Sequence, residues 1–466
     1  MHNRRKISLT GILVILILTG FGACKTTTNQ VTPAATNTPI TQSQTVTAIA
    51  TIALTPTSPM LHTVELDIMN NIKAHGFHAD PGINNGMGGL YINWRYGSNP
   101  LQVNVNGTGE TDETSGATLR HDDLTDLRYL HNLWSYKIEN PGDTSFDSDM
   151  NRYTPIIKHE FEKTHNERGW IYDILIDIYT LSHDTFYKEA AMSLARSYAK
   201  AYDPAIGMIY KKNSTTNIQG SYRTDNTLEA GCALIQAGAL TNNTDWIQKG
   251  KNIVNFLYTH AYIPQYHTFP AQIGHVLQTS GQLNPEQPFF AGLSNQSYQV
   301  DGGIVRMGNI SQIIISLLDT YQVTHEHDYL NKATDLLDAL SLPHNELKMW
   351  DTINGGYFYD LKFSGSSPSQ PGIASVDTKR KEAGRQATML QAYHLADKLT
   401  NNHYQDMENR MRNTALNGIY SASIHGVTYL VNTDWSFQKF KSGPYNDMDT
   451  TEAMGAELES LFFLSR

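Results

Sequence analysis

Two adjacent aspartates, Asp122 and Asp123, are candidates for acid–base chemistry. Hydrolysis of a glycosidic bond needs one carboxyl group that stays protonated to assist the leaving group and another that acts as nucleophile or base. Neighbouring acids can separate their pKa values, because the charge on one disfavours ionisation of the other. We therefore take both aspartates as candidate catalytic residues, although neighbours on a helix point about 100° apart.

A second pair of acids, Asp225 and Glu229, lies just after Arg223. On a helix these two acids share a face, and the Arg223 guanidinium can hold one of them ionised. They are further catalytic candidates, and Arg223 is a candidate for substrate binding. The alternative is an ion-paired support for the helix start, and the same alternative applies to Glu382 with Arg385.

Charged side chains cluster before six apolar segments, and aromatic side chains are frequent in the long segments between them. Side chains near helix starts often serve only as caps or ion pairs, so each assignment competes with a structural one. Aromatic side chains in loops can stack on the apolar face of a pyranose ring. The remaining candidates for substrate binding are Arg120, His121, His165, Asp301 and Glu382, together with the loop aromatics Trp94, Trp350, Tyr357 and Trp435.

A short pattern occurs four times in the chain: polar turn residues followed by an aromatic residue, at 182–187, 241–246, 324–329 and 400–404. Each copy lies between an apolar helical segment and a more amphipathic one. The polar residues can cap the second helix and the aromatic residue can pack against it, as a tight helix–helix connection requires. The repeat therefore predicts helical hairpins.

Extending this pattern predicts twelve helices in two alternating classes. The apolar helices are expected to begin near Leu119, Gly169, Asp225, Gly303, Lys381 and Thr450, and their amphipathic partners near Leu61, Asp149, Thr185, Asp245, Asp328 and Asn402. Alternating buried and half-buried helices favour an all-α (α/α)6 barrel with an inner and an outer ring. The long connections, 76–116, 204–223, 261–302, 344–378 and 417–447, are expected on one face, with small β-hairpins such as 350–359 and with the functional site.

The sequence resembles the six-hairpin glycosidase-like superfamily over nearly all of residues 60–466. The resemblance rests on the hairpin repeats and on the Trp350–Phe358 loop. It implies a carbohydrate-active enzyme, because the superfamily covers glycoside hydrolases, polysaccharide lyases and isomerases of the acylglucosamine 2-epimerase type. Asp122 and Asp123 resemble the aspartate pair of endo-α-1,6-mannanases, which implies roles as nucleophile and acid/base. The aromatic residues expected after that pair are replaced by Leu-Thr-Asp-Leu at 124–127.

A glycoside hydrolase acting on an extracellular glycan is the function that these features favour. An epimerase is the first alternative, and the resemblance then implies a histidine on the last inner helix, which residues 449–463 lack. A polysaccharide lyase is another, since Tyr222 and His165 could act as bases. A glycan-binding lipoprotein without catalytic activity is the third alternative.

The first residues form a predicted export signal. Positive residues at 4–6 precede an apolar stretch at 9–18 that is too short to span a bilayer comfortably. Residues 21–24 resemble a lipobox ending at Cys24, the expected lipidation site. Residues 25–59 are rich in Thr, Pro, Ala, Asn and Gln, which predicts a disordered tether. The expected organisation is signal peptide and lipobox 1–24, tether 25–59 and barrel domain 60–466, lipid-anchored at the extracytoplasmic face of the cell membrane.

The composition argues against several classes of partner and cofactor. The formal net charge is −10 with acids and bases interspersed, so no basic surface for nucleic acid is expected. The sequence has no phosphate-binding glycine loop, no His-Glu-x-x-His pair and no EF-hand loop, and we expect no cofactor and no metal. Cys232 is the only cysteine besides Cys24, so no disulfide framework is expected. We expect a monomer whose partner is a glycan substrate and which contacts the membrane only through its N-terminal lipid.

Overall fold

The computed structural model describes residues 58–79, 81–91, 93–95, 104–105, 118–119, 123–162, 168–212, 219–295, 298–300, 302–437 and 448–464. These residues all belong to one compact unit, Leu54–Arg466. The predicted signal peptide, the lipobox and residues 25–57 of the predicted tether lie outside the described residues and stay predictions, whereas Ser58 and Pro59 already belong to the first helix. Among the helices of the described ranges, none combines the length and the apolar character needed to cross a bilayer.

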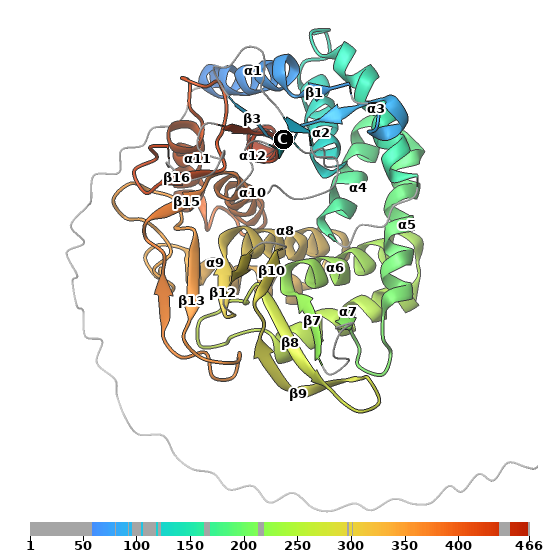
Figure 1. Cartoon of the computed structure of the whole chain (residues 1–466), viewed down its shortest axis with the longest axis vertical. Helices are drawn as coiled ribbons and strands as arrows, with labels where there is room; N and C mark the ends of the chain where they lie inside the picture. The colour runs from blue at the N-terminus through green and yellow to red at the C-terminus, as the bar shows by residue number, and fades with distance from the viewer. Residues whose placement is uncertain are drawn as a thin grey trace, which may run out of the picture. The chain divides into compact units, whose positions relative to one another are not determined.

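Six of the described helices follow one another in a closed inner ring (Figure 1). Each contacts the next, and the last contacts the first. In ring order they are α2 (Asp123–Glu139), α4 (Trp170–Ser182), α6 (Thr224–Thr241), α8 (Met307–Thr324), α10 (Ala383–Leu399) and α12 (Thr451–Leu464). The contact between α12 and α2 therefore joins the two ends of the domain.

Each inner helix packs against one outer helix: α2 on α3, α4 on α5, α6 on α7, α8 on α9, α10 on α11 and α12 on α1. The outer helices are α1 (Ser58–His75), α3 (Asp147–Phe161), α5 (Thr185–Ala201), α7 (Thr244–His260), α9 (His327–Leu340) and α11 (Gln405–Thr414). The prediction of an all-α (α/α)6 barrel is confirmed, and each helix begins within a few residues of its expected start.

The short connections have the local structure that the repeated pattern requires. The inner helices α4, α6 and α8 end at a residue in the left-handed conformation, namely His183, Asn242 and His325. In the first two of these connections the next residue caps the following outer helix: the Asp184 side chain accepts a hydrogen bond from the Phe186 amide, and Asn243 accepts one from the Trp246 amide. In the third, the N-cap Glu326 makes no side-chain cap hydrogen bond. A left-handed end followed by a side-chain cap reverses the chain within two residues.

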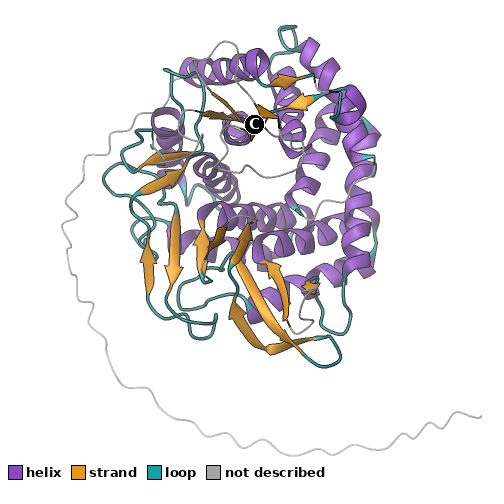
Figure 2. Cartoon of the chain, viewed as in Figure 1, coloured by secondary structure: helices purple, strands orange, loops and turns teal. Residues whose placement is uncertain are grey.

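The long connections carry short strands (Figure 2). The strands are β1 (Phe77–His78), β2 (Gly89–Leu90), β3 (Asn93–Arg95), β4 (Asn104–Val105), β5 (Thr118–Leu119), β6 (Lys211–Lys212), β7 (Gln219–Arg223), β8 (Gln272–Leu277), β9 (Leu283–Phe290), β10 (Leu293–Asn295), β11 (Tyr298–Val300), β12 (Ile304–Arg306), β13 (Asp360–Phe363), β14 (Ala374–Val376), β15 (Arg380–Glu382), β16 (Leu430–Asn432) and β17 (Met448–Thr450).

Some of these strands pair within one connection, as β1 with β2 and β10 with β11, and others pair across different connections. The four-stranded sheet β6-β7-β8-β9 joins the α5–α6 connection to the α7–α8 connection. Likewise β12 pairs with β13, β15 with β16 and β17 with β3. The predicted hairpin at 350–359 is present as an antiparallel bridge between Trp350 and Tyr357. Neighbouring connections therefore hold one another in place beside the starts of the inner helices.

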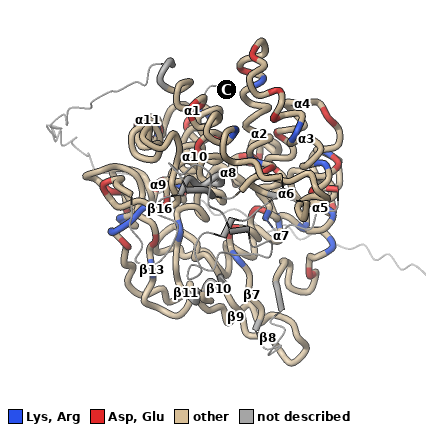
Figure 3. The backbone as a smooth tube through the Cα atoms, turned by 45° about the horizontal axis from the view of Figure 1, so that its top comes forward, with Lys and Arg blue, Asp and Glu red and all other residues tan. Residues whose placement is uncertain are grey.

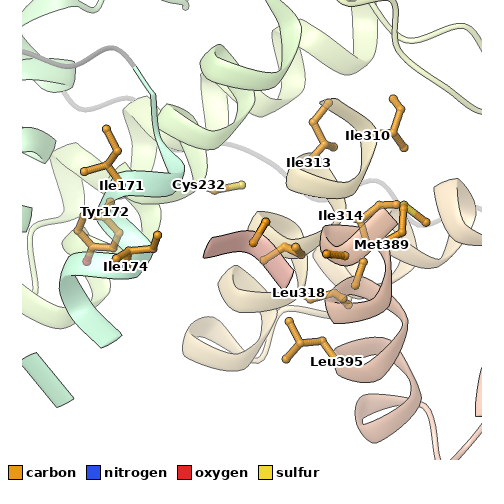
Figure 4. Packing of buried hydrophobic residues seen from close by; sticks show 14 of the residues in the cluster. Ile171, Tyr172, Ile174, Cys232, Ile310, Ile313, Ile314, Leu318, Met389 and Leu395 are labelled. Atoms are coloured by element: carbon orange, nitrogen blue, oxygen red, sulfur yellow. The ribbon is translucent and has the colours of Figure 1, made fainter. Parts of the chain in front are cut away.

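The hydrophobic core fills the space between neighbouring helices (Figure 4). Ile314 of α8 lies beside Met389 of α10, and both side chains are buried. The exposed surface of each outer helix remains polar, which explains the amphipathic pattern of these helices in the sequence.

Lys381, in β15, ties two of the long connections together. Its side chain is 0% exposed and donates to Asp351 Oδ2 at 2.9 Å, to the Gly355 carbonyl at 2.5 Å and to the Thr433 carbonyl at 2.7 Å. Its ammonium also lies 4.2 Å from the centroid of the Trp435 ring. Because Lys381 directly precedes Glu382, this clamp also fixes the strand that leads into α10.

We expect Lys381→Met to lower the free energy of unfolding by about 3–5 kcal/mol, because it leaves the buried Asp351 carboxylate without its cation. Urea unfolding followed by circular dichroism measures the change. The matched control is Lys379→Met, since Lys379 is an exposed lysine two residues away. Equal stability of the two variants would show that the clamp contributes nothing to the fold.

Candidate active site

Four inner helices of the described ranges begin directly after a strand, and before α6, α8 and α10 the last residue of the strand is a charged N-cap. The strand β7 ends at Arg223 before α6, β12 ends at Arg306 before α8, and β15 ends at Glu382 before α10. None of these three side chains makes a cap hydrogen bond. They enter ion pairs at the N-terminal ends of the inner helices, which we call the mouth of the barrel.

The Asp225 side chain is held by two residues, one at the start of its own helix α6 and one on the neighbouring inner helix α8. Arg223 donates to both carboxylate oxygens, from Nε at 3.1 Å and from Nη2 at 2.6 Å. Asn309 of α8 donates its amide to Asp225 Oδ2 at 2.7 Å. Bidentate guanidinium contacts of this kind hold the carboxyl group in a single geometry. The predicted pairing of Arg223 with Asp225 is confirmed.

Glu229 lies one turn further along α6 in a different environment. Its side chain is 1% exposed, and Oε2 accepts a hydrogen bond from the Trp170 amide at 3.2 Å. Burial and the nearby Asp225 raise the pKa of Glu229 to about 8. Burial therefore favours the protonated form of Glu229, whereas Asp225, on the same helix face, is paired with the Arg223 guanidinium.

The N-caps of α8 and α10 have partners of opposite charge. Arg306 donates to Asp360 at 3.2 Å across the β12–β13 pair, where the two residues are directly opposite. Burial, partly offset by Arg306, raises the pKa of Asp360 to about 6. The predicted pairing of Glu382 with Arg385 is also confirmed, with Nε donating to Oε1 at 3.1 Å. Figure 3 shows acidic and basic positions interspersed along the backbone.

A small, open pocket of about 20 Å³, room for little more than one water molecule, lies between the starts of α10 and α12 and the side of α2. Its lining residues are Arg128, Glu382, Gly384, Arg385, Thr388, Tyr429, Ala453 and Ala456. Small residues on α10 and α12 leave the space open, and charged or hydroxyl-bearing side chains supply its polar groups. Polar groups around so small a space suit a bound water molecule.

Arg128 of α2 is anchored beneath the pocket. Its Nε lies 2.8 Å from Glu459 Oε2 of α12, and its guanidinium lies 4.6 Å from the Trp170 ring centroid. The other Glu459 oxygen is 3.0 Å from His131 Nδ1, and His131 Nε2 is 3.6 Å from Asp177 of α4. The buried side chains of Arg128, His131 and Glu459 thus connect α2 and α12, and the half-exposed Asp177 of α4 lies at the end of the series.

Further acids lie deeper in the barrel. Burial and Asp177 raise the pKa of Asp319 to about 8, and burial together with Asp319 and Asp177 raises the pKa of Asp173. Burial alone raises the pKa of Glu457 to about 8. In the part of the chain that the structure describes, no group of histidine, cysteine and acidic side chains could hold a metal ion.

Several predicted site residues lie outside the described residues: Arg120, His121, Asp122, His165, Asp301 and the lipidation site Cys24. For Asp123 and Trp94 the structure places the backbone, with Asp123 as the first residue of α2 and Trp94 in β3. The assignments of these residues therefore remain predictions.

Two predicted sugar-stacking residues are core residues, and their assignment is wrong. Trp350 is 5% exposed and Tyr357 is 0% exposed. Their rings pack edge to face at 5.1 Å, and the Tyr357 hydroxyl bonds to that of Tyr393. The hairpin that holds them is packed under neighbouring connections, so no ring face remains for a sugar.

The remaining predicted sugar-stacking residue, Trp435, is half-buried. Its Nε1 donates to the Asn354 carbonyl at 2.9 Å, and its ring packs closely on Gly356 and Gly418. The structure therefore gives Trp435 a role in joining two connections, and its role in binding sugar remains a prediction.

The sequence did not single out Arg128, Glu459, Asn309 or Tyr429 as site residues. Asn309 reaches Asp225 from another hairpin, and Arg128 reaches Glu459 from the opposite end of the chain. One signal was present: Arg128 and Glu459 are charged residues within otherwise apolar inner helices, a combination that requires a partner.

Neither the comparison with protein-family models nor that with curated proteins gave a match. The solved structures gave several matches with the same fold. An unsaturated glucuronyl hydrolase from a Bacillus species matches with a TM-score of 0.58 and 13% identity, over 88% of this chain and 97% of that one. A D-mannose isomerase matches with a TM-score of 0.55 and 12% identity, over 88% and 98%.

An α-1,6-mannanase from a Salegentibacter species matches with a TM-score of 0.54 and 13% identity, over 87% of this chain and 98% of that one. The matched form is described as an inactive variant in which two consecutive aspartates are replaced by alanine. All three are six-hairpin toroids, so the chain has this fold. Because the same fold carries hydrolases and an isomerase, the fold alone leaves the reaction open.

Stability is expected to fall as pH rises from about 4 to about 8. In the folded state Glu457 keeps its proton up to its raised pKa of about 8, and neither of its carboxyl oxygens has a hydrogen-bond partner among the described residues. An unfolded glutamate loses its proton near pH 4.3, so in this window the folded state binds the extra proton. We expect Glu457→Gln to reduce the loss of unfolding free energy between pH 5 and pH 8 by more than about 1 kcal/mol.

Urea unfolding at both pH values measures this difference. Glu189→Gln, on the exposed side of α5, is the matched control and should leave the pH dependence unchanged. The same pH dependence in wild type and in Glu457→Gln would contradict the assignment of a raised pKa to Glu457.

Proposed function

We propose that the protein is a carbohydrate-active enzyme, a glycoside hydrolase whose active site is the mouth of the barrel. The observation that carries this proposal is the contrast between Asp225 and Glu229 on one face of α6. Asp225 is paired with Arg223 and Asn309, whereas burial and Asp225 raise the pKa of Glu229 to about 8. Glycosidic hydrolysis requires this combination of a protonated acid with an ionised carboxylate.

In this proposal Glu229, which is 1% exposed without substrate, is uncovered when the glycan binds and donates its proton to the glycosidic oxygen as the bond to the leaving sugar breaks. Asp225 stabilises the positive charge that develops on the sugar ring, or attacks it or activates the attacking water. The guanidinium of Arg223 and the amide of Asn309 keep Asp225 in one orientation, so that little reorganisation is needed during the reaction.

Asp122 and Asp123 are the second source of carboxyl groups at the mouth. Asp123 is the first residue of α2, an inner helix that begins at the same end of the barrel as α6. The inactivity of the mannanase variant without two consecutive aspartates supports testing this pair as well. Whichever pair is catalytic, the substrate must bind with its glycosidic bond at the mouth.

The alternatives predict different products. An isomerase of the matched fold would convert a free sugar without releasing reducing ends, and the described residues of α12 contain no histidine that could transfer a proton. A lyase would produce an unsaturated sugar that absorbs ultraviolet light. The experiment below separates both from hydrolysis.

We expect the purified full chain to release reducing ends, without ultraviolet absorbance of unsaturated products, from at least one member of a panel of α- and β-linked polysaccharides and uronic-acid polymers. Asp225→Asn or Glu229→Gln should lower the rate by about 10²–10⁴-fold, the typical contribution of a positioned acid or base. Asp122→Asn and Asp123→Asn test the other pair.

Asp328→Asn serves as the matched control, since it removes an exposed carboxylate from outer helix α9 and should leave the rate unchanged. Unsaturated products would contradict hydrolysis and show that the chain is a lyase. A chain that binds a glycan on the panel but changes none of them would contradict an enzymatic function.

We also propose that the chain is an exported lipoprotein that acts as a monomer on an extracellular glycan. The lipobox-like residues 21–24 and the uncharged, Thr- and Pro-rich segment 25–59 support this proposal. A surface anchor suits an enzyme whose substrate is too large to be imported.

Lipidation at Cys24 predicts that the mature chain begins at this residue and carries acyl groups. Expression with a radiolabelled fatty acid should label the wild-type chain, and Cys24→Ser should abolish the label and release the chain from the membrane fraction. Cys232→Ser is the matched control, since Cys232 is a buried free thiol of α6. Label retained in Cys24→Ser would contradict the proposed anchor.

A further inference from the structure

The inner helices carry a repeated apolar position at the end of the barrel opposite the mouth, which we call the lower end. In five of the six inner helices of the described ranges, the last residue but one is a large apolar residue: Ile138, Leu181, Leu240, Val323 and Phe463. The exposed fractions of Ile138, Leu240 and Val323 are 54%, 47% and 46%, and Leu181 and Phe463 are half-buried. Because the inner helices run in the same direction around one ring, these five residues lie around the lower end, and we call them the apolar ring.

The apolar ring does not simply continue an apolar stripe of the inner helices. Four residues earlier, on the same helix face, four of these helices carry a polar side chain: Asp177, Gln236, Asp319 and Glu459. Of the six large apolar side chains that are exposed in the described ranges, three belong to the apolar ring. Apolar side chains that gather at one end of a domain and stay about half exposed after folding indicate a surface for an apolar partner.

The starts of the outer helices lie at the same end and suit contact with lipid headgroups. Phe186 and Trp246, near the starts of α5 and α7, are half-buried. Acids at the starts of the outer helices are paired with lysines, in the pairs Asp184–Lys158, Asp245–Lys249, Glu326–Lys251 and Asp328–Lys332. Half-buried aromatic rings and lysine stems are typical of surfaces that lie in a headgroup region, and pairing the acids reduces their repulsion by anionic lipids.

The chain enters the barrel at its lower end. His62, in the second turn of α1, stacks on Tyr136 near the end of α2, with the ring centroids 6.4 Å apart. Asn71, towards the end of α1, contacts the sulfur of Met454 near the start of α12 at 3.9 Å. The helix α1 therefore runs from the lower end towards the mouth. The residues that precede Ser58 consequently join the barrel at the end that carries the apolar ring.

From these observations we propose that the lower end of the barrel docks on the lipid bilayer in which Cys24 is anchored, with the apolar ring in the headgroup region and the mouth facing away from the membrane. The proposal rests on the proposed lipidation of Cys24 and does not depend on the reaction at the mouth. A covalent anchor raises the effective concentration of the barrel at the bilayer, so a few apolar side chains suffice for docking. In this orientation the mouth is open to a glycan too large to pass between the barrel and the membrane.

The lipidated full chain, reconstituted into vesicles of phosphatidylcholine and phosphatidylglycerol, tests the proposal. A polarity-sensitive fluorescent probe is attached in turn to Leu240→Cys, Val323→Cys and Ile353→Cys, which is practicable because the native Cys232 is buried. Ile353→Cys is the matched control, since Ile353 is 88% exposed in the connection that leads to α10 at the mouth.

We expect the emission of the probes at 240 and 323 to shift to shorter wavelength in the vesicles and to be quenched by spin-labelled lipid. The physical reason is that docking places these side chains about 5–10 Å into the boundary between headgroups and acyl chains. The probe at 353 should show neither the shift nor the quenching.

A second pair of variants separates the apolar contact from the anchor alone. A probe on Ile138→Cys should lose most of its quenching when Leu240→Gln and Val323→Gln are combined in the same chain. It should keep its quenching when Ile353→Gln and Ile373→Gln are combined instead, because these changes remove two exposed apolar side chains from the connection that leads to α10. Circular dichroism of both combinations verifies that the barrel is folded.

Equal quenching of the probes at 240, 323 and 353, or quenching at 353 alone, would overturn the proposed orientation. Unchanged quenching of the probe at 138 when Leu240→Gln and Val323→Gln are combined would overturn the role of the apolar ring. Sedimentation in detergent tests the other occupant: a dimer that these two substitutions convert to a monomer would replace the bilayer by a second copy of this chain.

The docking and the anchor fail in different ways. A wild-type chain that carries no fatty-acid label would contradict the anchor and the docking together. A labelled chain that is bound to vesicles, with unquenched probes at 240 and 323, would contradict the docking and leave the anchor standing. Neither result affects the hydrolase, which the release of reducing ends tests separately.

Discussion

The close packing of the inner helices against one another is the constraint on which the rest of the structure depends. The ring closes only if each inner helix approaches the next, and glycine makes several of these approaches possible. A Cβ on Gly169 would lie 2.3 Å from the Glu229 backbone, and one on Gly384 would lie 2.9 Å from the Ala453 backbone. Glycines that would only weaken an isolated helix are therefore required here by packing between helices. The same closeness brings Arg128, Glu229 and Arg385 to one end of one ring.

Closure of the ring also determines how the connections are used. Since all inner helices begin at the same end, the long connections meet there and can pair through short strands. The strands β7, β12 and β15 each pair with a strand of another connection and lead directly into an inner helix. An N-cap such as Arg306 is thus held both by its own helix and by its partner strand, which carries Asp360. The mouth therefore consists of paired strands and helix starts, which are rigid elements, although it lies within the long connections.

Local features of the sequence predicted the fold well, because each hairpin is specified within a few residues. The caps at Asp184 and Asn243 lie within the repeated pattern, and the Arg223–Asp225 and Glu382–Arg385 pairs join residues close in sequence. The pairing of Asn309 with Asp225 depends instead on which hairpins become neighbours, and a single sequence carries no such information. The burial of Trp350 and Tyr357 was missed for the same reason, since it depends on which connections cover the hairpin.

The acids of the barrel show why a raised pKa does not by itself identify a catalytic group. Glu457 and Asp319 share with Glu229 a pKa of about 8, and in all three burial is the main cause. Glu457 has no charged neighbour that contributes, and Asp319 lies deeper along α8, so neither is combined with an ionised carboxylate at the mouth. Glu229 differs because Asp225, held by Arg223, shares its helix face one turn away. Glu229 and Asp225 therefore form a pair in which burial disfavours the charge on one acid, while Arg223 holds the other in a bidentate ion pair.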